Sequence, residues 1–175
     1  VSAQAGLEVA LLDRDMAAAN KGKAYTQERM EKRRDPRTAD VLARIHPTAD
    51  YADLAGSDLI IEAVFEDPAL KRDVTAKIEA VLGADTIYGS NTSTLPITGL
   101  QANWSKPENF IGIHFFSPVE KMQLVEIIVG RETGPEAIAK ALDYVAQIRK
   151  TPIVVNDSRG FYTSRCFGTF VQEGL

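Results

Sequence analysis

Short runs of apolar and β-branched residues alternate along this chain with longer segments of helical periodicity. This alternation is typical of βαβ units, in which a helix connects two parallel strands of one sheet. At 175 residues, the chain is long enough for one ordinary core but short for two complete domains. We therefore expect an α/β domain with a mostly parallel sheet. Strands are predicted at residues 8–12, 58–64, 86–89, 110–115, 125–129 and 153–155, with a weaker strand near Ile45.

Pro, Gly and short polar residues mark the ends of the predicted helices. Asp67 is followed by Pro68, as in an N-cap that precedes Pro at the first helical position. Gly83 lies where a left-handed residue could end the same helix. Gly134 and Pro135 open a further helix in a similar way, and it is predicted to run through residue 148. The charged segment 15–34 is predicted as a helix, or as part of a helical hairpin.

Both ends of the chain look interrupted. It has no initiating Met, and residues 1–6 have the pattern of a helix tail that leads into a strand. A strong turn signal at residues 156–160 follows the last predicted strand. We therefore expect one domain over residues 1–157 and the start of a helical domain over residues 158–175. The apolar face of that last helix would contain Phe167, Phe170, Val171 and Leu175.

Composition argues against several classes of partner. The chain carries 20 Lys and Arg against 24 Asp and Glu, and its net charge of -4 provides no global positive field for nucleic acid. The apolar N-terminal segment lacks a basic start and contains Glu8, so we do not interpret it as a signal peptide. No apolar run approaches the roughly 20 residues that a membrane span needs. The single cysteine, Cys166, fits a reducing compartment.

A carboxylate closes the first predicted strand. Asp13 ends the segment LEVALLD, where a carboxylate can accept hydrogen bonds from the ribose hydroxyls of a dinucleotide and repel a 2′-phosphate. Alternatively, Asp13 caps the following helix, and Asp15 competes for that position. The sequence contains no G-x-G-x-x-G loop, so we expect the first strand and that loop to lie before Val1. The prediction is a Rossmann-type sheet that lacks both.

His114 and Glu126 are the candidate catalytic pair. His114 stands in the apolar run IGIHFF, so its side chain either faces a cleft or has a buried partner. Glu126 lies on the next predicted strand, where its carboxylate could hold the imidazole in one tautomer and stabilise the imidazolium. A histidine at such a position can also be purely structural. His46, which precedes Pro47, is interpreted as structural.

Four segments resemble one family of enzymes: EAVFEDPALK at 62–71, SNTSTLPI at 90–97, GIHFFSPVEKMQLVEII at 112–128 and NDSRGF at 156–161. In their order and spacing they are similar to the 3-hydroxyacyl-CoA dehydrogenases, especially the module within bacterial multifunctional fatty-oxidation α subunits. The resemblance covers essentially the whole chain. It implies NAD-dependent oxidation of (S)-3-hydroxyacyl-CoA to 3-ketoacyl-CoA in fatty-acid β-oxidation. It also implies a homodimer or a fatty-oxidation complex subunit, located in a bacterial cytoplasm or an organelle matrix.

The resemblance assigns roles to individual residues. His114 takes the proton of the C3 hydroxyl, and Glu126 orients His114. Ser93 hydrogen-bonds the C3 oxygen of the substrate, although a turn or a helix cap is the alternative for its segment. For Glu66 and Lys71 the alternative is a solvated capping pair. The implied cofactor-binding positions are Asp13, Val64, Glu66, Lys71, Asn91 and Ser117, and no metal site is expected.

Two positions depart from the family pattern. Ser117 and Ser164 stand where the family commonly has Asn. Serine is shorter and has no amide donor, so any polar contact there would use its hydroxyl or a bridging water. The basic cluster between Arg29 and Arg34 is either a solvated helix face or, as in the equivalent hairpin of the family, a surface for the CoA phosphates.

Two other functions stay open at this point. One is a non-catalytic structural relative, because the lens λ-crystallins resemble this family. The other is a Rossmann dehydrogenase for β-hydroxyacids, which would have a lysine-centred site. The presence of Ser93, His114 and Glu126 argues against the first, and the His–Glu pair argues against the second. We also expect the 175-residue chain by itself to be catalytically silent, because it lacks the Gly-rich turn and most of the helical domain.

Overall fold

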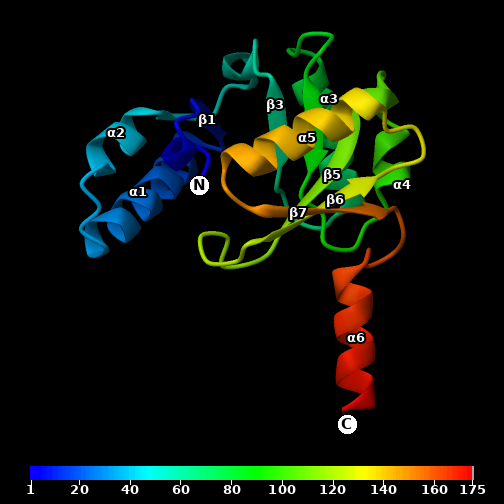
Figure 1. The fold of residues 1–175 in the computed structure, drawn as a ribbon. Helices are drawn as coiled ribbons and strands as arrows, with labels where there is room; N and C mark the ends of the chain where they lie inside the picture. The colour runs from blue at the N-terminus through cyan, green and yellow to red at the C-terminus, as the bar shows by residue number, and fades with distance from the viewer. Residues whose placement is uncertain (175) are drawn as a thin grey trace. The chain divides into compact units, whose positions relative to one another are not determined.

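The computed structural model describes residues 1–174, so the predicted apolar position Leu175 lies outside the described residues. The chain forms two compact units, Val1–Ala55 and a second that begins at Gly56 (Figure 1). Each unit contains parallel strands covered by helices, which confirms the α/β class. The domain boundary expected at residue 157 stays a prediction. Within the described residues, no helix is both long and apolar enough to cross a membrane.

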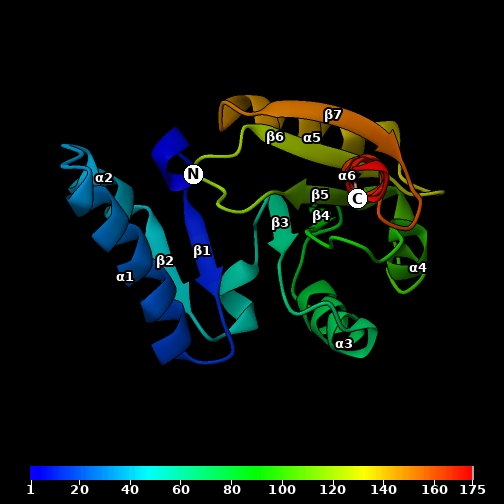
Figure 2. The same cartoon turned by 90° about the horizontal axis from the view of Figure 1, so that it is seen from below.

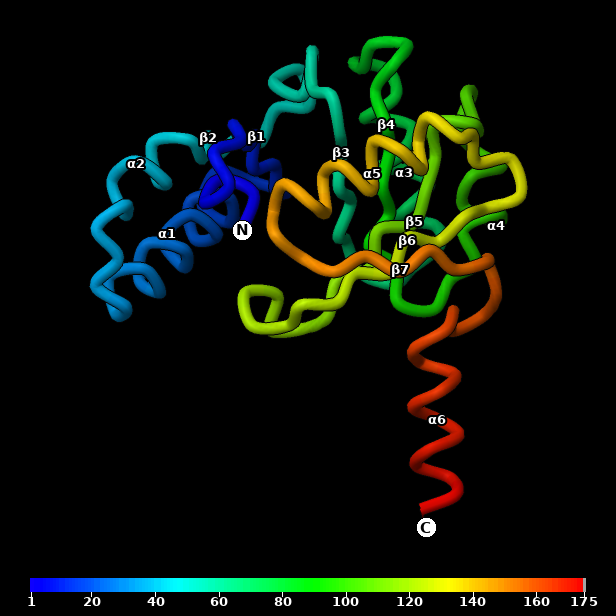
Figure 3. Tube along the Cα trace, viewed as in Figure 1, coloured from blue at the N-terminus to red at the C-terminus, as the bar shows by residue number. Residues whose placement is uncertain are grey.

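The N-terminal unit is a two-stranded parallel sheet covered by a helical hairpin. Strands β1 (Val9–Leu12) and β2 (Ile45–Thr48) pair in parallel, so the weak strand signal near Ile45 is confirmed. Between them run α1 (Met16–Lys32) and α2 (Thr38–Ala43), as the trace in Figure 3 shows. Met30 and Val41 pack with Ile45 in a small core. Instead of a helix tail, the first residues form a single 3₁₀ turn at Ala3–Ala5.

The second unit is built on a five-stranded sheet in the order β3-β4-β5-β6-β7. All neighbours in it are parallel except β5 and β6, which are antiparallel. This sheet confirms the expected Rossmann-type, mostly parallel arrangement. Its strands are β3 (Leu59–Glu62), β4 (Ile87–Ser90), β5 (Phe110–Phe115), β6 (Leu124–Val129) and β7 (Thr151–Asn156). Its helices are α3 (Pro68–Glu79), α4 (Ile97–Gln101), α5 (Pro135–Gln147) and α6 (Thr163–Glu173).

Helices cover both faces of this sheet. Figure 2 shows α5 on one side of the strands and α3 and α4 on the other. On the α3 side, Tyr88 stacks on Phe110 with ring centroids 4.9 Å apart, and its hydroxyl lies 3.1 Å from the hydroxyl of Thr75. Gly112 lets α4 approach, because a Cβ atom there would lie 2.8 Å from a side-chain carbon of Ile97. Both faces of β5 are therefore buried, as parallel-type sheets require.

Two details of the helices and strands differ from the expectation. Helix α3 ends at Glu79 and Gly83 is not left-handed, because the amide of Val81 already closes the last turn on the carbonyl of Ile78. Strand β3 ends at Glu62, since its carboxylate accepts the amide of Val64 at 2.7 Å and turns the chain.

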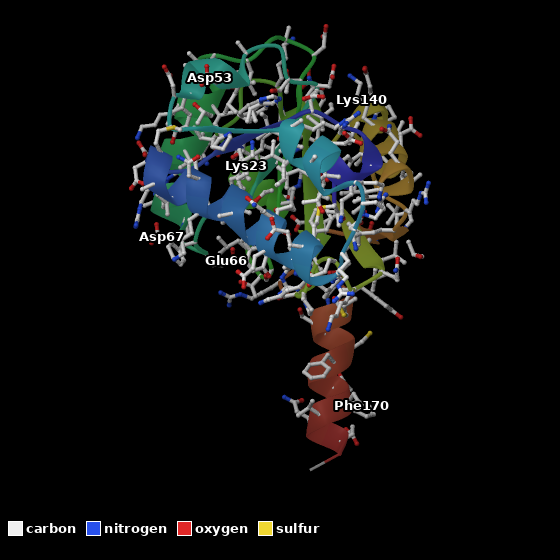
Figure 4. The ribbon with its side chains drawn as sticks, turned by 90° about the vertical axis from the view of Figure 1, so that its left-hand side faces the viewer. Lys23, Asp53, Glu66, Asp67, Lys140 and Phe170 are labelled. Atoms are coloured by element: carbon white, nitrogen blue, oxygen red, sulfur yellow. The ribbon has the colours of Figure 1, made fainter. Side chains whose placement is uncertain are left out.

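Helix α6 begins after a turn in which Gly160 has a φ of 74°. It contains no buried residue, and Phe167 and Phe170 are exposed, with Phe170 projecting from the helix in Figure 4. The apolar stripe expected at these positions is therefore present in the described part of the helix.

Candidate active site

The structure brings His114 and Glu126 together on neighbouring strands. Directly opposite residues in an antiparallel pair point to the same face, and His114 of β5 is the register partner of Glu126 of β6. The Nδ1 atom of His114 lies 2.7 Å from Oε2 of Glu126, and both side chains are buried. This contact leaves Nε2 as the ring nitrogen that can exchange a proton with a ligand.

The second oxygen of Glu126 binds the start of α6. Its Oε1 accepts the backbone amides of Thr163 at 2.9 Å and Tyr162 at 3.2 Å. Burial acts to raise the pKa of Glu126, but the hydrogen bonds from His114 and from the amide of Thr163 outweigh it and hold the pKa below its usual value. Glu126 is therefore ionised at neutral pH and has hydrogen-bond donors at both oxygens.

Two aromatic rings enclose the imidazole. The ring of Phe116 lies 4.5 Å from that of His114 between centroids, and the ring of Phe161 lies 6.0 Å away. Phe161 is buried although its φ is 48°, a conformation that costs a bulky residue roughly 1–3 kcal/mol. The turn that leads to α6 thus holds an aromatic side chain against His114 at the expense of backbone strain.

Ser93 lies on a loop that Glu66 holds in place. After β4, Oε1 of Glu66 accepts the hydroxyl of Thr92 at 2.6 Å and the amides of Ser93 at 2.8 Å and Thr94 at 2.9 Å. Burial acts to raise the pKa of Glu66, but these donors and the charge of Lys71 outweigh it and lower the pKa to about 2. The side chain of Ser93 is exposed, while its backbone is fixed.

Lys71 is enclosed. Its Nζ atom lies 2.9 Å and 3.2 Å from the two carboxylate oxygens of Glu62, and both side chains are 2% exposed. It also lies 3.5 Å from Oε2 of Glu66. The alternative of a solvated capping pair is therefore wrong for Lys71. The N-cap of α3 is Asp67, which accepts the amide of Leu70 at 2.7 Å.

The other predicted positions of the second unit lie at the carboxyl ends of its strands. Asn91 follows β4, and its Oδ1 accepts the amide of Phe115 at 2.8 Å. Its NH₂ group has no hydrogen-bond partner among residues 1–174 and is therefore available to a ligand. The carbonyl of Val64 accepts Nζ of Lys71 at 3.4 Å. Ser117 is exposed in the loop after β5, next to a cis peptide bond to Pro118.

Asp13 is an exposed carboxylate at the end of β1 in the N-terminal unit. Its Oδ1 accepts the amide of the next residue, Arg14, at 2.7 Å. The N-cap of α1 is Asp15, which accepts the amide of Ala18 at 2.8 Å, so the capping alternative for Asp13 is wrong. His46 is exposed and lies 2.8 Å from a carboxylate oxygen of Glu8.

Sequence reasoning missed three residues that support this site. Glu62 is a buried carboxylate at the end of an apolar strand, a placement that by itself predicts a cationic partner. Asp157 accepts the amides of Ile97 and Thr98 at 2.9 Å and 2.8 Å, which ties the turn before α6 to α4. Phe161 lies in the segment NDSRGF that resembles the family, but no role of its own followed from the sequence. In the part of the chain that the structure describes, no three potential metal ligands cluster.

The sequence of this chain is similar to those of known proteins. A family model described as the NAD-binding domain of 3-hydroxyacyl-CoA dehydrogenase matches residues 1–158. The fatty acid oxidation complex subunit alpha of Shewanella frigidimarina is 45% identical over 134 residues, which are 77% of this chain and 19% of that protein.

Two solved structures extend the comparison. The (S)-3-hydroxybutyryl-CoA dehydrogenase of Ralstonia eutropha superposes with a TM-score of 0.92 at 37% identity, over 98% of this chain and 62% of that one. The 3-hydroxybutyryl-CoA dehydrogenase of Escherichia coli K12 superposes with a TM-score of 0.88 at 27% identity, over 98% of this chain and 39% of that one. This chain therefore spans less than two thirds of each of these relatives. It belongs to the 3-hydroxyacyl-CoA dehydrogenase family, and it corresponds to that family's NAD-binding domain.

Proposed function

We propose that this chain contributes the chemistry of an NAD-dependent oxidation of (S)-3-hydroxyacyl-CoA to 3-ketoacyl-CoA in fatty-acid β-oxidation. The observation that carries the proposal is the buried contact of 2.7 Å between His114 and Glu126. A secondary alcohol must lose its hydroxyl proton during such an oxidation, and a neutral imidazole is a side-chain base that can accept it.

His114 is the general base in this proposal. Its Nε2 atom accepts the proton of the C3 hydroxyl, while Nδ1 keeps its own proton and donates it in a hydrogen bond to Oε2 of Glu126. The ionised carboxylate of Glu126 fixes the tautomer and stabilises the imidazolium that forms. Ser93 directs its hydroxyl to the C3 oxygen and so orients the carbinol, a role in positioning rather than in nucleophilic attack.

The residues present fit a dinucleotide at several points. In the N-terminal unit, Asp13 is exposed and suited to the hydroxyls of the adenosine ribose. In the second unit, the NH₂ group of Asn91, the backbone at Val64 and the exposed part of Glu66 are suited to the nicotinamide half. Ser117 is exposed and can contribute its hydroxyl. NAD, when bound, supplies the acceptor for the hydride from C3.

The same proposal includes a substrate, an assembly and a cellular location. We infer an acyl-CoA thioester as the substrate, and a homodimer or a subunit of a fatty-oxidation complex as the assembly. The Shewanella relative, by its name a subunit of such a complex, supports the second form. Bacterial cytoplasm is the proposed location. The net charge of -4 agrees with a small-molecule partner rather than nucleic acid.

The test compares substrates and histidines in the full-length protein. NADH formation is measured with (S)-3-hydroxybutyryl-CoA and with free 3-hydroxybutyrate, for the wild type, His114→Ala and His46→Ala. His46 is the matched control, because its side chain is exposed and lies 2.8 Å from a carboxylate oxygen of Glu8. We expect turnover of the thioester that falls roughly 10²- to 10⁴-fold in His114→Ala and is unchanged in His46→Ala. No turnover by the wild type would favour a non-catalytic relative, and equal turnover of the free acid would favour a β-hydroxyacid dehydrogenase.

A further inference from the structure

A buried lysine that the proposed mechanism does not use contacts the loop between β5 and β6. Lys150 directly precedes β7, and it is 9% exposed. Its Nζ atom donates to the backbone carbonyl of Val119 at 2.6 Å and to that of Met122 at 2.5 Å. Burial lowers the pKa of Lys150 from its usual value. Because a desolvated ammonium group is costly unless it is hydrogen-bonded, the positions of Lys150 and of the loop depend on each other.

We propose that Lys150 is a positioning residue of the active site. It fixes residues 116–123, the β5–β6 loop, and thereby holds Phe116 beside His114 and Ser117 beside the cofactor. This inference rests on the proposed roles of His114 and Ser117. It deepens the proposed function, since it adds a residue that acts through the loop and contacts neither substrate nor cofactor.

Backbone hydrogen bonds determine the shape of the β5–β6 loop, because most of its side chains are exposed. The carbonyl of Pro118 accepts the amides of Lys121 at 2.9 Å and Met122 at 3.1 Å, which makes a compact turn. As at the end of a helix, such a turn leaves carbonyl oxygens that need other donors. The carbonyls of Val119 and Met122 have Lys150 as their donor. The ammonium group thus connects the turn to the sheet.

The backbone on both sides of Lys150 is fixed. Before it, Arg149 has a φ of 59°, a left-handed conformation that is uncommon for a residue with a long side chain. The amide of Lys150 then closes the end of α5 on the carbonyl of Val145 at 3.0 Å. After it, the amide of Thr151 donates to the carbonyl of Gln123 at 2.8 Å, where the β5–β6 loop enters β6. The lysine side chain therefore extends from a rigid support, and its hydrogen bonds transmit that rigidity to the loop.

The other end of the β5–β6 loop begins beside the proposed base. Phe116 is the first residue after β5, and its ring lies 4.5 Å from the ring of His114 between centroids. Ser117 follows directly. If the loop loses its two contacts with Lys150, its carbonyls pair with water instead and the loop samples other conformations. Phe116 then no longer encloses the imidazole, and the hydroxyl of Ser117 leaves the place where the cofactor is expected.

The experiment removes the ammonium group of Lys150 in the full-length protein. Lys150→Met keeps a long side chain without charge or donors, and Lys150→Gln restores an NH₂ group with two N–H donors. Lys140→Met is the matched control, because Lys140 lies on α5 with an exposed side chain 3.1 Å from Glu136.

Three properties are measured on each variant. The first is hydrogen exchange of the loop amides of Lys121 and Met122, with the amide of Ile127 in the middle of the sheet as the reference. The second is the NMR signal of the His114 ring in protein with labelled histidine, identified by its loss in His114→Ala. The third is function, as the Kd of NADH and kcat/KM with acetoacetyl-CoA.

We expect Lys150→Met to speed exchange of both loop amides roughly tenfold or more, while the amide of Ile127 stays within about twofold of wild type. The His114 signal should move, because the aromatic ring of Phe116 shifts the resonances of nearby protons. The value of kcat/KM should fall roughly tenfold, and the Kd of NADH should rise, since the part of the loop at the cofactor is displaced. Lys150→Gln should give intermediate values, and Lys140→Met should match wild type.

Two results would overturn the proposal. In the first, the loop amides and the His114 signal of Lys150→Met stay as in wild type. In the second, exchange accelerates equally at the loop and at Ile127, because Lys150 would then stabilise the whole sheet rather than the loop. If Lys150→Met does not fold, the same two criteria apply to Lys150→Gln.

A failure of the proposed function would look different. If the wild type does not turn over the thioester, the proposed function fails, while the exchange rates and the His114 signal still decide whether Lys150 orders the loop. If the wild type is active and Lys150→Met mobilises the loop without changing Kd or kcat/KM, the positioning role of Lys150 is wrong.

Discussion

Replacing Glu126 with Gln removes a negative charge and one of two buried hydrogen-bond acceptors at nearly constant volume. In the wild type, Oε2 faces Nδ1 of His114 at 2.7 Å, and Oε1 faces the amides of Tyr162 and Thr163. All of these neighbours are donors. A glutamine offers one oxygen and one NH₂ group, so in either orientation a donor of the protein meets a donor of the side chain.

The cost follows from this mismatch. A hydrogen bond to a charged group contributes about 1.5–3 kcal/mol, and leaving a buried donor unpaired costs about 1–3 kcal/mol. The lost hydrogen bond and the unpaired donor describe the same loss, so the two costs are not added. We expect the free energy of unfolding to fall by about 2–3 kcal/mol. If the side-chain oxygen of the introduced glutamine faces the start of α6, the imidazole of His114 loses its acceptor, and turnover should fall roughly 10²-fold or more.

The assay measures both quantities on the same variant of the full-length protein. Urea unfolding gives the stability, and NADH oxidation with acetoacetyl-CoA gives kcat. Glu132→Gln is the control, because it removes the same charge from an exposed position after β6. A variant of Glu126 that loses stability but keeps its turnover would make this residue an anchor of α6 only. A variant that loses neither would refute the reasoning from the 2.7 Å contact.

Three further predictions concern other parts of the chain. Asp13 should make the full-length protein prefer NADH to NADPH, and Asp13→Asn should narrow that preference in a comparison of Kd values; a wild type that prefers NADPH would show that Arg14 dominates instead. Glu66 has a folded-state pKa lowered to about 2 from 4.5, so its contribution to stability is complete above about pH 4.5 and is lost as the pH falls toward 2. The gap in urea midpoint between wild type and Glu66→Gln should therefore shrink below pH 4.5, and a gap independent of pH would contradict this assignment. Asp157→Ala should lower stability by about 1–2 kcal/mol, since the amide of Ile97 loses its acceptor, and an unchanged urea midpoint would argue otherwise.

Local sequence patterns were sufficient for much of the fold. The strand predicted at residues 110–115 matches β5 at both ends, and Asp67 caps α3 as its place before Pro68 indicates. These features depend on side-chain alternation and on capping groups within a few residues, which a linear pattern contains. The choice between Asp13 and Asp15 as the cap of α1 was not decidable in this way, because both carboxylates lie within reach of the same helix start.

Only part of the candidate site could be predicted from the sequence. His114 and Ser93 stood out by residue type and by the family resemblance, and Glu126 followed from its strand. The role of Glu66 as the anchor of the Ser93 loop was not visible, because its partners lie 26 to 28 residues away along the chain. The family resemblance implied a cofactor-binding role for Lys71, with a solvated capping pair as the alternative, and only the structure shows that this lysine is buried against Glu62.

What the sequence determined by itself was therefore the kind of element at each position and the chemistry available there. The tertiary structure alone decided that β6 runs antiparallel to β5, which makes Glu126 the register partner of His114 on one face of the sheet. It alone decided that Lys71 lies between Glu62 and Glu66. The physical reason is that strand direction and the pairing of buried charges depend on contacts between segments that are far apart in the chain. The free energy of these contacts is set by the assembled core, and neighbouring residues in the sequence do not determine it.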